Sequence, residues 1–410
     1  MRTVWALLKG IGLSIGILAV VASAHALLWT EQYAFPEPSS FAGDVWYNPY
    51  AELEHRSLLL GNFQVQSDAW AGITNGRNNS SERVFEIYGS LGYHVISISD
   101  YMAINRFVAD SAQHYPVYEH GYGAWKTHQL CLGARSVRVL DFPLFQTRSN
   151  KQHVLNALQQ DCGAVAIAHP SLRNAYSRED LARLTGFDLI EAVSKFKMSM
   201  SHWDAALSAG RPAFLISNDD AHDLDRPQEY GRCATVVAAK ALTPDAVWDA
   251  LKAGSAYAYV PNCPEKEQHA EKCKRFLRRP ELRAVDVRAD TTGAQLLCIR
   301  ASLPISSVRW IGPHSDTLAI SAVDSRYDSA VFRLPREAAY VRAELDFESG
   351  DVLYLNPVIR TRDGKLQPPT PAAYLPVATA AGRVAFVLFL FGAALRGVWV
   401  SRRRLRLVRA

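Results

Sequence analysis

Between residues 57 and 260 the chain alternates short apolar runs with segments that carry helix start and stop signals. One such segment opens with Thr243-Pro244, an N-cap residue followed by a proline at the first helical position, and stops at Gly254. Repeated strand–helix units predict an α/β fold with a parallel sheet, either open or closed. About seven units fit in this length, which favours a distorted TIM-like (β/α)7 barrel over a doubly wound sheet. The barrel domain is expected over residues 30–262.

The individual elements of this domain follow from the same signals. Strands are expected at 57–63, 94–99, 164–168, 189–193 and 213–217. Helices are expected at 81–91, 178–185 and 203–209, the first two with Ser81 and Ser177 as N-caps.

After Pro280 the pattern changes to short strands separated by turn residues. The run 340–347 (YVRAELDF) alternates apolar and polar residues, as expected of a half-buried antiparallel strand. Residues 281–371 are therefore expected to form a small antiparallel module similar to a β-sandwich. The charged stretch 263–280 is expected to be a linker that acts as the hinge between the two domains.

The N-terminal 29 residues have the pattern of a signal peptide or signal anchor. Residues 10–29 hold no acidic or basic side chain except His25, and Arg2 and Lys9 precede them. Ala24-His25-Ala26 fits the small-x-small rule for cleavage after Ala26. The alternative is a buried core helix, which the absence of an amphipathic period disfavours.

A second apolar run at 375–400 predicts a transmembrane helix. Its centre, 384–395, is only 12 residues long, whereas a span needs about 20, but arginines near the ends can snorkel. The basic tail 401–410 is typical of a stop-transfer signal on the cytoplasmic side. The alternative is an amphipathic helix that lies on the membrane surface. Both ends predict that residues 30–371 lie outside the cell (inner) membrane, in the periplasm or the exterior.

The net charge of +5 is located at the two ends. Five arginines in the tail account for all of it, and Arg2 and Lys9 leave residues 10–401 with a net charge of about −2. A nucleic-acid-binding protein would carry its positive charge over a folded face, so this class is excluded. Six cysteines are an even number in a chain predicted to be exported, and Cys263 and Cys273 are expected to form a disulfide across a charged loop.

Polar residues with metal-binding chemistry follow the ends of the predicted strands. Asp100, His169 and the run 217–222 (SNDDAH) each come directly after a strand, and Glu119 and His128 lie between the first two. In a parallel barrel the C-terminal strand ends meet at one face. Carboxylates and imidazoles gathered there form a divalent-metal site.

The stretch from about residue 61 to 259 resembles the PHP (polymerase and histidinol phosphatase) family of metal-dependent phosphoesterases. ISISD (96–100) is similar to the second motif of that family, AHP (168–170) to the third and SNDDAH (217–222) to the fourth. The segment 236–259 resembles its closing strand, helix and strand, and LNPV (355–358) the β-module often appended to exported members. The resemblance implies a distorted TIM-like barrel with up to three divalent metals, where a metal-bound water hydrolyses a phosphate ester.

Several metal ligands of the family are replaced in this chain. Gln64 and Gln66 stand where the first motif has His-x-His, and Tyr101 stands where the second motif has its histidine. A glutamine offers only a neutral carbonyl oxygen, a poor substitute for imidazole at zinc or manganese. The resemblance therefore implies fewer than the family's three metals, with zinc, manganese or iron as candidates.

The surviving residues divide into two groups. By resemblance, Glu119, His128 and His169 match the ligands that hold one metal, and Asp220 and His222 match ligands of its two neighbours. Asp100, Asp220 and His222 are the candidate catalytic residues. Structural roles remain open, because Asp220 and His222 could bond to each other and Asp100 could simply cap the barrel.

The expected function is a membrane-tethered, extracytoplasmic, PHP-like metal-dependent phosphoesterase with a reduced metal site. Its substrate would be a phosphorylated small molecule or an envelope component. The alternative is a catalytically inactive PHP-like module that binds a ligand or a cell-envelope partner. The loss of the first-motif imidazoles favours the module, whereas the surviving Glu/His/His set favours the enzyme.

Overall fold

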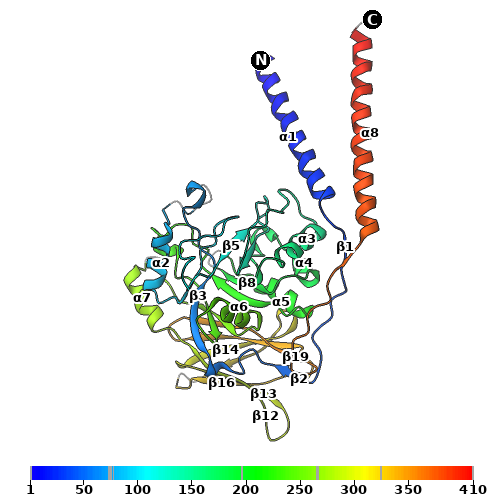
Figure 1. Cartoon of the computed structure of the whole chain (residues 1–410). Coiled ribbons are helices and arrows are strands. Elements are labelled where there is room, and N and C mark those ends of the chain that lie inside the picture. The colour runs from blue at the N-terminus through cyan, green and yellow to red at the C-terminus, as the bar shows by residue number, and fades with distance from the viewer. Residues whose placement is uncertain are drawn as a thin grey trace.

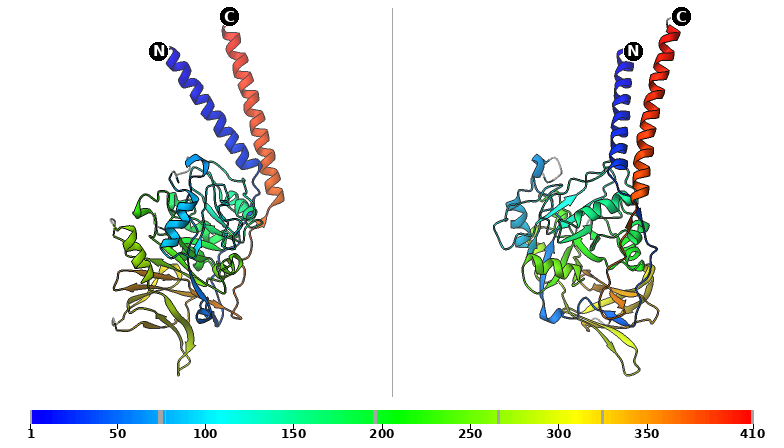
Figure 2. Two further views of the ribbon diagram at one scale, coloured as in Figure 1. Left: turned by 60° about the vertical axis from the view of Figure 1, so that its left-hand side comes forward. Right: turned by 45° about the vertical axis from the view of Figure 1, so that its right-hand side comes forward.

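The computed structural model describes residues 2–408 except 73–75, 77, 195–196, 265–266 and 324–325. Two long helices, one at each end of the chain, project from the same side of an α/β body (Figure 1). The strands of residues 282–333 lie at the opposite end of that body, and both further views show the same arrangement (Figure 2).

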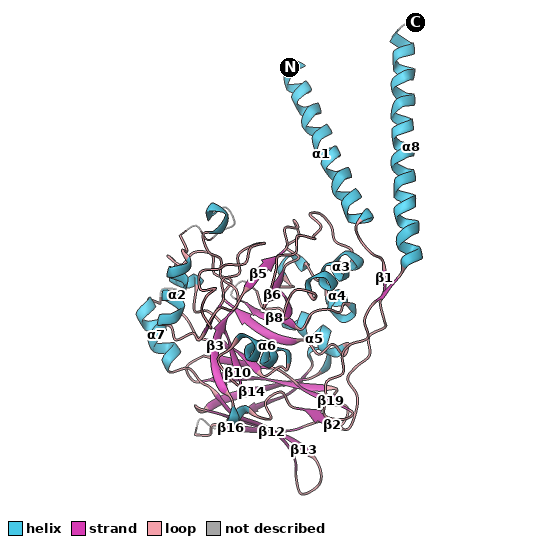
Figure 3. Ribbon diagram, viewed as in Figure 1, coloured by secondary structure: helices cyan, strands magenta, loops and turns pink. Residues whose placement is uncertain are grey.

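The helices and strands are distributed along the whole chain (Figure 3). The helices are α1 (Arg2–Leu28), α2 (Ser81–Ser90), α3 (Arg148–Leu158), α4 (Arg178–Arg183), α5 (Met200–Ser208), α6 (Pro244–Lys252), α7 (His269–Leu277) and α8 (Pro376–Val408). The strands of the first half are β1 (Tyr33–Ala34), β2 (Val45–Tyr47), β3 (Ser57–Asn62), β4 (Val95–Ile96), β5 (Val117–His120), β6 (Gln129–Leu132), β7 (Ala164–Ile167), β8 (Leu189–Ser194), β9 (Phe214–Asn218), β10 (Ala234–Ala239) and β11 (Ala256–Val260). Those of the second half are β12 (Leu282–Ala289), β13 (Gln295–Ala301), β14 (Ile305–Ile311), β15 (Thr317–Ala322), β16 (Ser329–Arg333), β17 (Tyr340–Phe347), β18 (Val352–Leu355), β19 (Val358–Thr361) and β20 (Ala373–Tyr374).

Side-chain caps fix where several helices begin. Thr147 caps α3 and Ser177 caps α4, each in a capping box with the third helical residue, Asn150 and Asp180 respectively. For α2 the cap is Ser80, whose side chain accepts from the backbone N–H of Arg83, so the prediction of Ser81 was wrong by one residue. Such shifts are expected where two serines adjoin, because either can supply the capping oxygen.

The strands of the α/β part form two sheets. One has the order β5-β6-β7-β8-β9, and the other runs β15-β14-β17-β18-β11-β10-β3-β4, with β19 and β2 at a branch. Among the described strands, only the pairs β3–β4, β7–β8 and β8–β9 are parallel. The prediction of a parallel sheet throughout was therefore wrong for β5–β6, β6–β7, β3–β10 and β10–β11, which pair antiparallel. A loop of eight residues without a helix joins β5 to β6, and such a short connection allows only antiparallel neighbours.

Among the described strands, hydrogen-bonded ladders do not close into a ring, so the sheet topology does not show the expected TIM-like barrel. Where β9 meets β10 and β11, side chains replace the backbone ladder. Thr235 bonds through its hydroxyl to both the N–H and the carbonyl of Ser217, at 2.8 Å each. The Asn356 side chain accepts from the N–H of Leu215 at 2.8 Å and donates to the carbonyl of Ala256 at 2.9 Å. At this seam between β9 and the pair β10–β11, side chains thus satisfy backbone N–H and carbonyl groups without a continuous sheet.

The β-rich part shares a sheet with the α/β part. Strand β18 pairs antiparallel with β11, with Tyr257 opposite Leu355. In β17, Arg342 reaches across to Asp204 of α5 at 2.8 Å and to Glu344 at 2.7 Å, and all three side chains are buried. The expectation of a half-buried strand at 340–347 was wrong, because its charged residues are neutralised inside the protein rather than exposed to solvent.

The charged stretch 263–280 contains the helix α7, which packs against the body. Phe276 is fully buried, and its ring lies 5.5 Å from those of Tyr93 and Tyr259. All six cysteines, which lie in the described part of the chain, are free thiols, so the predicted disulfide is not formed. The Cys263 thiol donates to the carbonyl of Gly231, whereas the Cys273 thiol lies 3.5 Å from His269, one helical turn away.

Two helices are long and apolar enough to cross a membrane by length and composition, Leu7–Leu28 within α1 and Pro376–Trp399 within α8. Their large apolar side chains are mostly exposed. The bases of the two helices are tied together, because β1 pairs with β20 and the N–H of Gln32 donates to the Thr379 hydroxyl at 2.9 Å. Both helices therefore leave the body at one place (Figure 1).

Candidate metal centre

Three potential metal ligands meet at one end of the five-stranded sheet. Glu119 lies in β5, His128 directly precedes β6 and His169 follows β7. Because β6 pairs antiparallel with both β5 and β7, the end of β5, the start of β6 and the end of β7 share one edge. One ligand atom from each residue lies within 4.8 Å of the others, and all three residues are buried.

Electrostatics couple the three side chains. Glu119 Oε1 contacts His128 Nδ1 and lies 3.4 Å from His169 Nε2. Burial raises the pKa of Glu119, but the two imidazoles outweigh it and hold that pKa below its usual range. Burial alone would lower the pKa of His169, yet the Glu119 carboxylate raises it to about 9. The carboxylate is therefore ionised, and it favours positive charge at this place.

Unpartnered polar atoms around the three ligands test whether a cation fits there. Among the described residues, Oε1 of Gln66, whose amide nitrogen donates to Glu119, and Oδ1 of Asp220 are buried without a hydrogen bond. Buried polar atoms normally have a partner, so their number here points to a missing one. One carboxylate and two imidazoles suit zinc, manganese or iron, and three protein ligands leave a position open. The residues present thus fit a divalent metal.

Gln66 and Tyr101 lie beside the group. Gln66 donates from Nε2 to Glu119 Oε2 at 2.8 Å and to the carbonyl of Ser99 at 3.0 Å. The Tyr101 ring meets the His128 ring nearly edge-on, with centroids 5.4 Å apart. One oxygen of Glu119 is therefore engaged by an amide, and the other faces the two imidazoles.

Sequence and structure comparisons give a loose likeness. No protein-family profile and no curated protein matches the chain. The crystal structure of a two-domain protein containing a predicted PHP-like metal-dependent phosphoesterase, from Bacteroides vulgatus, aligns over 82% of this chain and 99% of that chain. Its TM-score is 0.38 and its sequence identity 10%, so the properties of this centre rest on its own residues.

Asp220 lies near the three ligands but outside the convergent group, and His222 contacts Asp220. The N–H of Asp220 donates to the carbonyl of Gln64 at 3.0 Å, and its own carbonyl accepts from His222 Nδ1 at 2.7 Å. Burial raises the pKa of the Asp220 carboxyl, which also interacts with the charges of Glu119 and the nearby imidazoles. With a φ of 49° it holds a left-handed backbone that non-glycine residues seldom adopt, and this strain is common at functional sites.

Asp100 braces two loops. Its carboxylate accepts from the N–H and the hydroxyl of Ser67 at 2.8 Å each and from the Asn105 amide at 3.1 Å. Burial raises its pKa, against these hydrogen bonds. These contacts account for its buried charge, and it does not belong to the convergent group.

Glu191 is the polar residue that sequence reasoning weighted too lightly. It lies in β8, all of whose residues are buried, and accepts from the N–H of His169 at 2.9 Å and from Asn218 Nδ2 at 3.0 Å. Burial raises its pKa to about 8. The signal was present in the sequence as a single acid inside the apolar run LIEAVS, because a buried carboxyl needs specific partners.

Proposed function

We propose that this protein is a membrane-tethered, extracytoplasmic hydrolase of phosphate esters that uses one divalent metal. Glu119, His128 and His169 would hold the metal. The observation that carries the proposal is the convergence of these three buried side chains, with one ligand atom of each within 4.8 Å of the others. A buried carboxylate costs desolvation energy, and a bound cation offsets that cost.

The residues of this chain take separate roles in the proposed reaction. A bound divalent metal supplies Lewis-acid activation of a phosphoryl oxygen and of water. Gln66 fixes the orientation of Glu119 through its 2.8 Å hydrogen bond, as outer partners of metal ligands commonly do. Asp220 Oδ1, buried and without a hydrogen bond among the described residues, accepts the proton of the attacking water. The partly exposed His222 returns a proton to the leaving alcohol.

The proposal includes a location of the protein at the inner membrane. The apolar stretches of α1 and α8 would both cross the inner membrane, with the body in the periplasm or the exterior. The basic tail supports this orientation through the positive-inside rule. The substrate would be a phosphorylated small molecule or an envelope component.

One observation favours the second candidate, a binding module without catalysis. Both amide atoms of the buried Gln64 lack a partner among the described residues, which suits a polar ligand bound by neutral groups. Gln66 and Tyr101 likewise offer poorer ligands for a second metal than an imidazole does.

The deciding experiment measures bound metal and hydrolysis in the purified full chain. The protein is incubated with zinc, manganese or iron, analysed by mass spectrometry and assayed for phosphatase and phosphodiesterase activity. We expect about one metal per chain, and in His169→Ala the loss of that metal with an activity drop of about a hundredfold or more. His55→Ala, on an exposed histidine, is the matched control. Absence of metal and activity in the native chain would favour the binding module.

A further inference from the structure

An aromatic path leads outward from the metal centre along the loop between β5 and β6. From His128 the path passes to the Tyr101 ring at 5.4 Å, and the Lys126 ammonium lies 5.6 Å from that ring. Trp125, the residue before Lys126, is exposed and meets the Phe145 ring edge-on at 5.1 Å. The N–H of Ala124 also donates to the carbonyl of Pro143 at 2.9 Å, which joins this loop to the 142–150 segment.

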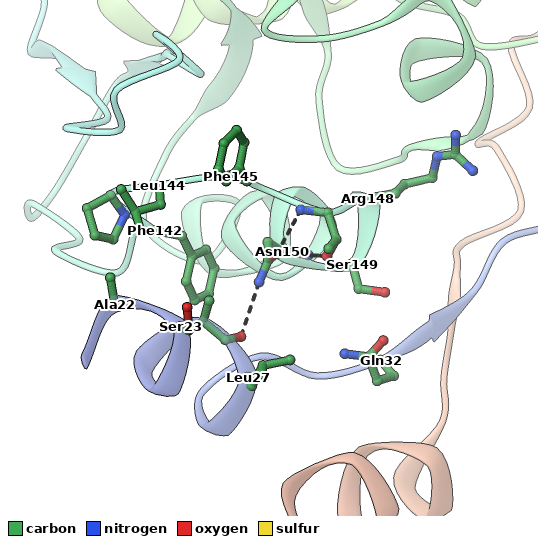
Figure 4. Close-up of a pocket in the computed structure, with 13 residues that line it drawn as sticks. Ala22, Ser23, Leu27, Gln32, Phe142, Leu144, Phe145, Arg148, Ser149 and Asn150 are labelled. Atoms are coloured by element: carbon green, nitrogen blue, oxygen red, sulfur yellow. Dashed lines mark hydrogen bonds between the residues drawn. The ribbon is translucent and has the colours of Figure 1, made fainter. Parts of the chain in front are cut away.

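The 142–150 segment is docked on the end of α1. The Phe142 ring lies 5.4 Å from that of His25, and Asn150 Nδ2 donates to the carbonyl of Ala26 at 3.3 Å. Between the segment and the helix lies a cavity of about 480 Å³ (Figure 4). Its walls include Phe142, Leu144 and Phe145 on one side and Ala22 and Leu27 of α1 on the other.

The position of this cavity along α1 sets its depth in a bilayer. The helical residues that line it belong to the last two turns of the apolar stretch Leu7–Leu28. This stretch has 22 residues, so it rises about 33 Å, and the hydrocarbon core is about 30 Å thick. If α1 spans the membrane, the 142–150 segment lies at the boundary between acyl chains and headgroups. Phe145, 70% exposed, and Trp125, 46% exposed, are residues that suit this boundary.

Two cations contact the loop that extends from the metal centre to this boundary. Lys126 is next to the path, and Arg173 donates from Nη1 to the carbonyl of Ala124 at 2.8 Å in the same loop. An apolar end at the membrane boundary, cations at the loop and a cation-binding centre at its other end match a molecule with an acyl chain and a phosphate head.

We propose, on the basis of the proposed function, that the substrate is a lipid phosphate drawn from the membrane that α1 and α8 cross. Its phosphate reaches Glu119, His128 and His169, while its acyl chains stay in the bilayer beside Phe145. In the reaction the oxygen of water bonds to phosphorus and the ester P–O bond breaks. The water proton passes through Asp220 and the leaving lipid alcohol takes up a proton from His222, so that no oxidant or second substrate is needed.

The kinetic test uses the full chain, loaded with the metal it binds, in phosphatidylcholine nanodiscs. Phosphatidate in the nanodiscs is the lipid probe, and glycerol 3-phosphate in solution offers the same phosphate monoester without acyl chains. We expect kcat/KM to favour phosphatidate, and Phe145→Ser to lower the ratio of the two activities by about tenfold, since it removes one apolar contact with lipid. Ile320→Ser, on an apolar residue 66% exposed in β15, should leave the ratio unchanged.

The outcomes separate this inference from the proposed function. Hydrolysis of neither ester would overturn the lipid substrate, and inactivity in the phosphatase and phosphodiesterase assays as well would overturn both. Equal hydrolysis of the two esters, with an unaltered ratio in Phe145→Ser, would overturn the lipid substrate and leave the phosphoesterase intact. An independent readout is tryptophan quenching by brominated phosphatidylcholine: the native chain should lose more fluorescence than Trp125→Phe. Identical quenching in the two proteins would show that Trp125 does not reach the lipid and would overturn the placement.

Discussion

At the scale of single residues, Glu119 has the charge and contacts that define the centre. Its Oε1 faces two imidazoles and its Oε2 accepts from Gln66. A carboxylate that is fully buried stays ionised only with such partners, and a divalent cation would satisfy it further. The neighbouring Asp100 is equally buried, but its hydrogen bonds to Ser67 and Asn105 already satisfy it. The groups that each carboxylate contacts, rather than its burial, distinguish the candidate metal ligand Glu119 from the structural residue Asp100.

Replacing Glu119 by glutamine tests this role without a change of shape. We expect Glu119→Gln to lose its bound metal, because an amide removes the negative charge that attracts the cation. The measurement is the shift of Tm on adding metal. Saturation at a hundredfold excess over Kd stabilises the native chain by about 2.7 kcal/mol, and the variant should show no shift. Glu54→Gln, on an exposed glutamate, is the control. A shift of equal size in Glu119→Gln would contradict the assignment.

At the scale of elements, the buried ion pair between Lys151 and Asp180 connects α3 to α4. Lys151 of α3 donates from Nζ to Asp180 Oδ2 at 2.7 Å and to the carbonyl of Ala175 at 2.6 Å. Asp180 also completes the capping box with Ser177. Burial raises the pKa of Asp180, but Lys151 outweighs it and keeps that pKa below its usual range. The pair therefore holds in place the helix that follows the His169 loop.

The stability contributed by this pair should depend on pH. Because the folded pKa of Asp180 is depressed, the carboxylate stabilises the protein above its unfolded pKa, and this is lost as the pH falls through the folded pKa. Asp180→Asn keeps the shape and the cap but should cost about 3 kcal/mol at neutral pH. Thermal unfolding over the acid range should show the difference shrinking. Glu271→Gln, in an exposed pair with Lys274, should change the stability far less, because water screens that pair. A difference that stays constant into acid would contradict the role of the charge.

At the scale of the whole molecule, the α/β part and the β-rich part form one structural unit. The ladder between β11 and β18 continues one sheet across both. Asn356 bonds to the backbone of β9 and β11, and Arg342 is buried between Asp204 and Glu344. A metal centre held by β5, β6 and β7 is therefore backed by strands that arise more than 150 residues later in the chain.

Denaturant unfolding tests whether the α/β part and the β-rich part unfold together. Arg342→Leu leaves Asp204 buried without its cation and should cost about 3–5 kcal/mol in the free energy of unfolding. Because the sheet is shared, denaturant unfolding should remain a single transition at a lower midpoint. Arg309→Leu removes an arginine that is largely exposed and should have a small effect. Two separate transitions, with only one moved by Arg342→Leu, would show independent domains instead.

Local signals carried the predictions that the structure confirms. The helix that starts at Pro244, the cap at Ser177 and the existence of the strand 340–347, though not its half-buried character, depend on residues close together in the chain. Pairing direction was predicted wrongly because a strand–helix alternation does not by itself specify which neighbour a strand meets. The predicted disulfide was wrong for a related reason, because closeness in sequence did not bring the Cys263 and Cys273 thiols together.

By itself the sequence determined the two apolar terminal helices and the candidate metal ligands, because hydropathy and residue chemistry are properties of short segments. Only the tertiary structure decided that Glu119, His128 and His169 converge while Asp100 does not. It also decided that Gln66 donates a hydrogen bond to Glu119. In the same way it placed the Thr235 and Asn356 side chains where they bond to the backbone of β9 in place of a strand ladder. These contacts join residues far apart in the chain, and they form only when packing brings the sheets together and every buried polar group must find a partner.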